Sequence, residues 1–249
     1  MAGRLLAHSR PATTRRRSTL VAYCLVLMQA APSARAARPM VTDDARITDP
    51  YACQLEAWQK STRSGHEYWA FPACNPTGNL EITLGVNDLP GDGGGRIYDY
   101  VLQGKTLFRE LETNGYGWGL AAGVYAHADP MPGQGRMGAS YFYLPFSASF
   151  RDDLFIIHLN LGAQDNRDRD AKPVVYGAGM EINFTRRFAL IAETYGDSLG
   201  SPYYQAGVRI WIIPGRFQID ATQGARFGDF SESRWWTIGV RLISPPFMK

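Results

Sequence analysis

Beyond residue 50, apolar and polar residues alternate in short runs that are bounded by Gly, Pro, Asn and Asp. In the run 80–86 every even position is apolar. In the run 174–184 the even positions are Val, Tyr, Ala, Met, Ile and Phe, whereas Glu181 is odd. The same alternation recurs in 204–210, 217–221 and 236–242. A period of two residues is typical of β-strands with two unlike faces, so the pattern predicts an all-β protein.

Strand-like runs of this kind cover the chain almost to its end. Twelve strands are expected, over 52–60, 65–73, 78–87, 96–111, 116–126, 137–149, 154–163, 174–185, 188–195, 203–212, 217–222 and 235–243. The connections after the even-numbered strands are short, whereas most of those after the odd-numbered strands are longer and polar. Near-alternation of short turns and long loops is typical of closed antiparallel transmembrane β-barrels, and an even strand count leaves both termini in the periplasm.

The N-terminus carries an export signal. Arg4, Arg10 and the arginines at 15–17 precede an apolar stretch over 19–31, and Ala34 and Ala36 flank Arg35 as in an A-x-A cleavage site. A transmembrane anchor is the alternative, but the stretch is shorter than the ~20 residues that a spanning helix needs. We therefore expect a signal peptide over 1–36, an N-terminal periplasmic lead-in over 37–50 and an outer-membrane β-barrel over 51–249.

Removal of the signal peptide changes the charge balance. Residues 1–36 contain six arginines and no acidic residue, so the formal net charge falls from +3 to −3. The basic excess therefore belongs to the targeting segment, and the sequence gives no support for nucleic-acid binding.

Of the three cysteines, Cys24 leaves with the signal. Cys53 and Cys74 remain in an oxidising compartment, where we expect them to form a disulfide that pins the first hairpin.

The contents of the two strand faces indicate which face lines the barrel. The polar face of the later strands carries charges of both signs, which we term the lumenal charge ladder: Glu181, Glu193, Arg209, Asp220 and Arg241. Opposite charges on neighbouring strands can neutralise each other inside a narrow barrel. The alternative is that they are ordinary exposed charges on a soluble sheet.

Aromatic residues near strand ends indicate membrane girdles: Tyr98, Tyr100, Phe108, Trp118, Tyr141, Tyr143, Phe184, Phe188, Tyr203, Tyr204, Trp235 and Trp236.

Several stretches carry a family resemblance, namely 38–45, 53–58, 73–81, 105–109 and 114–119. They resemble the family of predicted outer-membrane proteins described as putative components of the MetA pathway of phenol degradation. The resemblance covers most of the mature chain, through turns and strand starts and without a catalytic signature. It implies an outer-membrane barrel with a transport role, in the outer membrane of a Gram-negative bacterium.

Three functions remain open. The first is a passive channel or transporter for an unknown small solute, with outer-membrane lipid and the assembly machinery as partners and with no cofactor or metal. The second is a lipid-modifying enzyme that uses His158 with Ser147 or Ser149, although no G-x-S-x-G elbow supports it. The third is a soluble periplasmic β-sandwich that binds a ligand.

The aspartates at 165, 168 and 170 alternate with arginines, so we interpret them as a solvated loop and not a calcium site. We expect no catalytic residue.

Overall fold

The computed structural model describes residues 40–91, 95–130 and 134–248. The signal peptide predicted over 1–36 lies outside these residues and stays a prediction. The strands are β1 Cys53–Thr62, β2 Gly65–Cys74, β3 Glu81–Pro90, β4 Arg96–Arg109, β5 Tyr116–His127, β6 Met137–Phe150, β7 Phe155–Asn166, β8 Val174–Asn183, β9 Phe188–Asp197, β10 Tyr203–Ile213, β11 Phe217–Arg226 and β12 Trp235–Ile243, with the short helix α2 Phe230–Ser233 between the last two. No helix in this part of the chain has the length and apolar character needed to cross a membrane.

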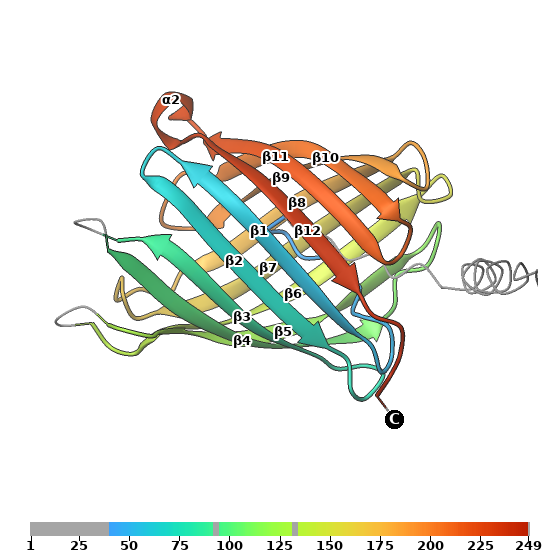
Figure 1. Ribbon diagram of the computed structural model, residues 1–249, viewed down its shortest axis with the longest axis horizontal. Coiled ribbons are helices and arrows are strands. Elements are labelled where there is room, and N and C mark those ends of the chain that lie inside the picture. Colours follow the sequence, from blue (N-terminus) through green and yellow to red (C-terminus); the bar gives the residue numbers. More distant parts are fainter. Residues whose placement is uncertain (1–39, 92–94, 131–133, 249) are drawn as a thin grey trace, which may run out of the picture. The chain divides into compact units, whose positions relative to one another are not determined.

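The strands form one closed antiparallel barrel (Figure 1). Each strand pairs with its neighbour in sequence, and β12 returns to pair with β1, so that Arg241 lies opposite Glu56. Closure leaves no unpaired strand edge. All twelve predicted strands are present, so the barrel is confirmed and the alternative of a soluble β-sandwich is wrong.

The two ends of the barrel differ. We use "turn end" for the end with the connections after β2, β4, β6, β8 and β10, and "loop end" for the opposite end, where α2 lies. In Figure 1 the turn end is on the right with the C-terminus, and the loop end is on the left. Strands β3, β7 and β11 extend to Pro90, Asn166 and Arg226, further than expected. The loops are correspondingly shorter, because polar residues at the strand ends continue the backbone hydrogen bonding between neighbouring strands.

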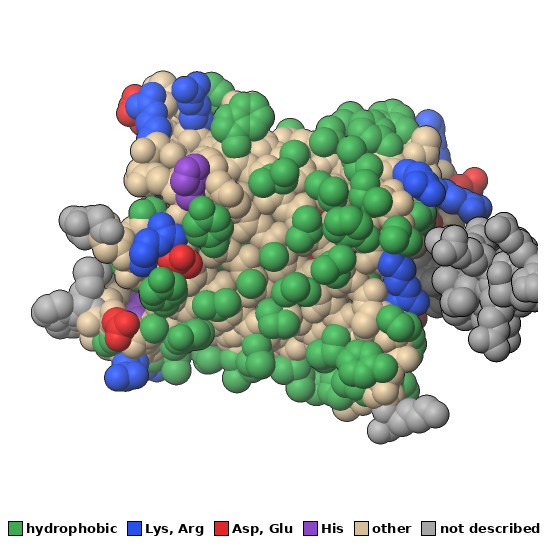
Figure 2. Space-filling view, in the orientation of Figure 1, with side chains coloured by type: hydrophobic (Ala, Val, Ile, Leu, Met, Phe, Trp, Pro, Cys, Tyr) green, Lys and Arg blue, Asp and Glu red, His purple; other side chains and the backbone are tan. Residues whose placement is uncertain are grey.

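The barrel is apolar outside and polar inside. Leu84 and Leu161 on the outer face are 60% and 61% exposed, whereas Lys105 and Arg241 on the inner face are at most 2% exposed. Figure 2 shows the same division, with apolar side chains spread over the wall and charged side chains gathered at its two ends. This distribution is the inverse of a water-soluble sheet and suits a wall surrounded by lipid.

The prediction of an aromatic girdle is wrong for four of its residues. Tyr141, Tyr143, Tyr203 and Trp235 point into the lumen: Tyr141 donates to Gln103, Tyr143 donates to Asp43, and Trp235 is 4% exposed. The reason is parity, since each of these residues is an odd number of positions from an outward neighbour on its strand. Nearness to a strand end does not decide which face a side chain takes.

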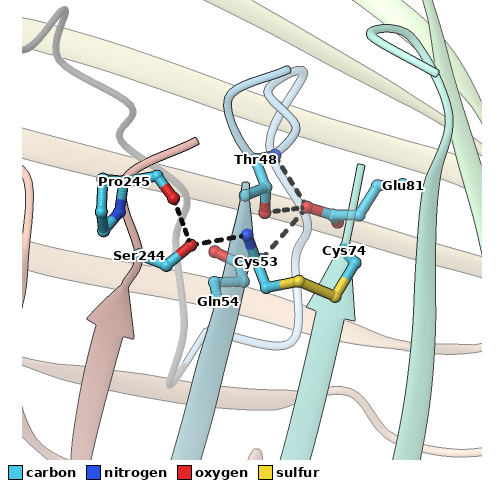
Figure 3. Close-up of a disulfide and its surroundings, with 7 residues drawn as sticks. All are labelled: Thr48, Cys53, Gln54, Cys74, Glu81, Ser244 and Pro245. Atoms are coloured by element: carbon cyan, nitrogen blue, oxygen red, sulfur yellow. Dashed lines mark hydrogen bonds between the residues drawn. A yellow bond between two sulfur atoms is a disulfide. The ribbon is translucent and has the colours of Figure 1, made fainter. Parts of the chain in front are cut away.

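The disulfide lies at the turn end (Figure 3). It joins Cys53 at the start of β1 to Cys74 at the end of β2, which are directly opposite in the register. Both occupy strand positions on the outer face, with Leu55 and Pro72. The backbone N–H of Cys53 also donates a hydrogen bond to Ser244 Oγ after β12. The disulfide therefore lies beside the seam where β12 pairs with β1.

We expect Cys74→Ser to lower the free energy of unfolding by about 2–4 kcal/mol, because the bond restricts the unfolded chain. Urea unfolding in detergent micelles, followed by tryptophan fluorescence, measures the change. Wild type under reducing conditions is the matched control and should fall by the same amount. Equal midpoints for the variant, the reduced protein and the oxidised protein would show that the bond is not a stabilising one.

Candidate functional site in the barrel lumen

Arg209 of β10 is the centre of a buried charge cluster in the lumen. Its Nη1 lies 2.6 Å from Glu181 Oε1 on β8, and its Nε lies 2.9 Å from Asp220 Oδ1 on β11. The three side chains are at most 2% exposed. Gln218 donates to the second oxygen of Asp220 at 2.6 Å. A guanidinium held between two carboxylates in this way resembles a structural brace more than a binding site open to solute.

The other two residues of the lumenal charge ladder have different partners. Arg241 Nε lies 3.3 Å from Glu56 Oε1 and 2.8 Å from Gln54 Oε1, both across the seam where β12 meets β1. Glu193 is bonded to Gln205 and to backbone N–H groups of the N-terminal segment. Three of the five ladder residues are therefore in one cluster, and Glu193 and Arg241 are not part of it.

Residues 40–49 lie inside the lumen, and we term them the N-terminal plug. They belong to the segment that we expected as a periplasmic lead-in; residues 37–39 lie outside the described part of the chain. The plug is held through its backbone. Its N–H groups donate to side chains of four strands: Val41 and Thr42 to Glu193 (2.7 and 2.6 Å), Asp43 to Asn160 (2.7 Å), Ala45 to Ser147 (2.8 Å) and Thr48 to Glu81 (2.8 Å).

Ion pairs add to these hydrogen bonds. Asp43 accepts from Lys105 Nζ and from the Tyr143 hydroxyl, each at 2.8 Å. Asp44 lies 3.6 Å from the same Lys105, and Arg46 reaches Glu181 at 4.0 Å. The plug therefore supplies the two carboxylates that are paired with the buried Lys105. It also approaches the Arg209 cluster, because Arg46 lies near Glu181.

The plug leaves the lumen at the turn end. There Asn75 Nδ2 donates to Thr48 O at 2.8 Å, and Tyr51 N donates to Asn75 O at 2.8 Å. Figure 3 shows Thr48 and Gln54 converging on Glu81 beside the disulfide. Burial raises the pKa of Asp49 in this connection, although Arg216 and Arg241 act in the opposite direction. The plug and the first strand are thus joined beside the disulfide, where Thr48 and Gln54 both bond to Glu81.

Two glycines on the inner face of β8 make room for the plug. A Cβ at Gly177 would lie 2.6 Å from Thr42 Oγ1, and a Cβ at Gly179 would lie 2.3 Å from Met40 Cε. Real Cβ atoms do not approach other atoms so closely, so a larger residue at Gly177 would require the Thr42 side chain to move, and one at Gly179 would require the flexible end of Met40 to move. These glycines are an indirect sign in the sequence that the lumen holds something besides strand side chains.

The plug fills its level of the lumen. Around it, Ser147 and His158 are 0% exposed, Glu181 is 1% exposed, and Ala45 and Asp44 of the plug are 0% exposed. Water does not reach these side chains, so the barrel is closed at this level in the observed conformation.

Ser147, His158 and Glu181 form a row next to the plug. Ser147 Oγ lies 2.8 Å from His158 Nδ1, and His158 Nε2 lies 3.5 Å from Glu181 Oε1. The residue types match those of a hydrolase triad. However, Ser147 faces the lumen, is fully buried and accepts the N–H of Ala45. In this arrangement the serine holds the plug, and a lipid chain has no access to it. Ser149 is separate and contacts Asp153 and Asn114 in the turns.

Within the described residues, no group of His, Cys, Asp and Glu has the arrangement needed to hold a metal ion. Asp168 of the loop after β7 turns toward β5, where its carboxylate lies 3.0 Å from His127 Nε2. His127 also lies 2.7 Å from Asp99 through Nδ1. The loop is thus tied to the barrel rim, and the sequence did not indicate this contact.

A family model matches residues 24–243, which is most of the chain. The chain belongs to the family described as uncharacterised conserved protein UCP029691. For UCP029691 proteins the model gives no activity, and the resemblance to the MetA-pathway family stays a prediction. A comparison with curated protein sequences found no match.

Solved structures similar to this UCP029691 chain include two porins and another outer-membrane protein. KdgM porin aligns with a TM-score of 0.56 at 9% identity, over 76% of this chain and 98% of that chain. NanC porin aligns with a TM-score of 0.51 at 9% identity, with the same coverage. Omp33 of Acinetobacter baumannii aligns with a TM-score of 0.47 at 10% identity, over 77% and 97%. The alignments with KdgM and NanC, whose TM-scores exceed 0.5, show that the chain has the fold of outer-membrane porin barrels.

Proposed function

We propose that the protein is a channel for small solutes in the outer membrane of a Gram-negative bacterium, with its turn end in the periplasm. The observation that carries the proposal is the inverted distribution of side chains, with exposed leucines outside and charged residues inside a closed wall. Part of this polar lumen braces the barrel, and once the lumen is free its polar wall gives a hydrated path across the membrane.

The observed conformation is the closed state of this channel. The plug is held by hydrogen bonds and ion pairs and has only Met40, Val41, Ala45 and Ile47 as apolar side chains. Water can replace each polar contact when the plug withdraws, so release exchanges one set of hydrogen bonds for another. Passage of solutes follows withdrawal of the plug toward the turn end, where it is connected to β1.

The open lumen is expected to select cations. Among buried charged residues on the strands, acidic residues outnumber the basic residues Lys105, Arg209 and Arg241; the acidic set is Glu56, Glu81, Asp99, Glu181, Glu193 and Asp220. When the plug leaves, Glu81 and Glu193 lose their N–H donors from the plug and face the path as carboxylates. Rings of carboxylates favour cation passage.

Planar-bilayer recording tests both statements. We expect discrete current steps from the purified protein and, in a KCl gradient, a reversal potential with the sign for K⁺ preference. Glu193→Gln should move the reversal potential toward zero, while Glu112→Gln, which removes an exposed carboxylate paired with Arg109 in the turn after β4, is the matched control. Steps with chloride preference would refute the selectivity, and the absence of any steps, also after removal of the plug, would refute the channel.

A further inference from the structure

A cavity lies next to the plug, toward the loop end of the barrel. It has a volume of about 440 Å³, and Val41 and Thr42 of the plug line it. Residues of the six strands β6 to β11 and of the loops after β7 and β9 complete the lining, among them Tyr143, Val175, Tyr195, Tyr203, Arg226 and Arg169. This volume is within the range of small-molecule sites. The charge cluster around Arg209 does not line it.

Arg226 places a positively charged guanidinium in the lining of this cavity. Its Nη2 donates to the Tyr203 hydroxyl at 2.8 Å, and its guanidinium lies 5.2 Å from the centre of the Tyr203 ring. Within the described chain it has no ion pair. Arg169, the other arginine of the lining, differs because its Nη1 lies 2.6 Å from Asp197 Oδ2. Arg226 is therefore the cation of the cavity that can take an external anion.

Tyr195 adds a second donor and an apolar surface. Its ring stacks on Tyr203 with the centroids 5.6 Å apart and the planes 23° apart. Its hydroxyl has no hydrogen-bond partner in the described part of the chain and can donate to a ligand. The rings of Tyr195 and Tyr203, together with Val41 and Val175, give the rest of the cavity a mainly apolar surface.

We propose that this cavity binds a small organic anion with one carboxylate on an apolar body. The carboxylate accepts hydrogen bonds from Arg226 and from the Tyr195 hydroxyl, which are charge-assisted and specific for an anion. The apolar body packs against Val175, Val41 and the tyrosine rings. Deeper in the lumen, Glu193 and Asp43 repel a carboxylate, so the charged end stays toward the rim. This goes beyond the proposed function, because binding requires neither conduction nor plug release.

Isothermal titration calorimetry of the full chain in detergent micelles tests the site with cyclohexanecarboxylate. Cyclohexylmethanol, which has a similar body without the charge, and acetate, which has the charge without the body, should both bind at least about tenfold more weakly. Arg226→Gln and Tyr195→Phe should each weaken binding of cyclohexanecarboxylate by about tenfold or more. Arg63→Gln, an exposed arginine paired with Glu232 at the same end, should leave it unchanged.

Heat-modifiable migration in detergent gels verifies that each variant keeps its barrel. Undetectable binding of cyclohexanecarboxylate, or equal binding of the alcohol, would overturn the proposal. Tighter binding of cyclohexylmethylamine would overturn it in favour of a cation site built on the tyrosine rings. Bilayer currents are read separately, so a protein that binds the anion but carries no current refutes only the channel, and the reverse result refutes only this site.

Discussion

Deletion of residues 40–48 is expected to convert a channel that is closed for most of the time into one that conducts continuously. The plug occupies the level of the lumen where Lys105, Ser147, His158 and Glu181 are buried, so its removal exposes these side chains to water and opens a path along the charged wall. The barrel itself keeps every strand pair. Planar-bilayer recordings of the variant should show long-lived open steps, whereas wild type shows brief ones.

A covalent lock gives the opposite result with the plug still present. A Cβ at Gly177 would lie 3.3 Å from Thr42 Cβ, close to the 3.5–4.5 Å that a disulfide spans. Oxidised Thr42→Cys/Gly177→Cys protein should therefore carry no current, and a reductant should restore it. Wild type with the same reductant is the control, because its Cys53–Cys74 bond lies on the outer face. If deletion and lock both leave the current as in wild type, the plug does not close the channel.

The strands were predictable because their signal is local. A period of two with Gly, Pro, Asn or Asp at the ends specifies a two-faced strand whatever its neighbours are, and the closed barrel then follows from twelve such runs joined by short connections. The pairing of Arg209 with Asp220 is also local, because β10 and β11 form a hairpin and place these residues opposite each other. Arg241 with Glu56 was not predictable in this way, since the pair exists only after the first and last strands meet.

The plug was not predictable because nothing in its own sequence specifies its conformation. It has no period, and its N–H groups bind side chains up to 152 residues away. Its partners Glu193, Asn160 and Ser147 belong to three different strands that converge only in the closed barrel. The signals that existed were indirect: two inward glycines on β8 and a polar segment with Asp43, Asp44 and Arg46 directly after the predicted cleavage site.

The buried charged residues of the strands form two groups, one paired within the barrel wall and one paired with the plug. The Arg209 cluster is made wholly of strand residues, whereas Lys105, Glu81 and Glu193 have partners in the plug. Substitutions in the first group should affect the barrel, and substitutions in the second group should affect the closed state. The two groups meet at Glu181, which Arg46 of the plug approaches.

Arg209→Gln is expected to lower the free energy of unfolding by about 3–5 kcal/mol, the cost of leaving buried carboxylates without their cation. Glu181 and Asp220 lie 2.6 and 2.9 Å from the guanidinium and have no access to water. Arg209→Gln/Asp220→Asn should recover part of the loss, because one uncompensated charge is removed. Arg96→Gln, which breaks an exposed pair with Asp88, should lower the free energy of unfolding much less, because water screens that pair. Urea unfolding in micelles, read from tryptophan fluorescence and from heat-modifiable migration, gives all three values. Equal losses for Arg209→Gln and Arg96→Gln would show that the lumen around Arg209 is hydrated and that the cluster is no brace.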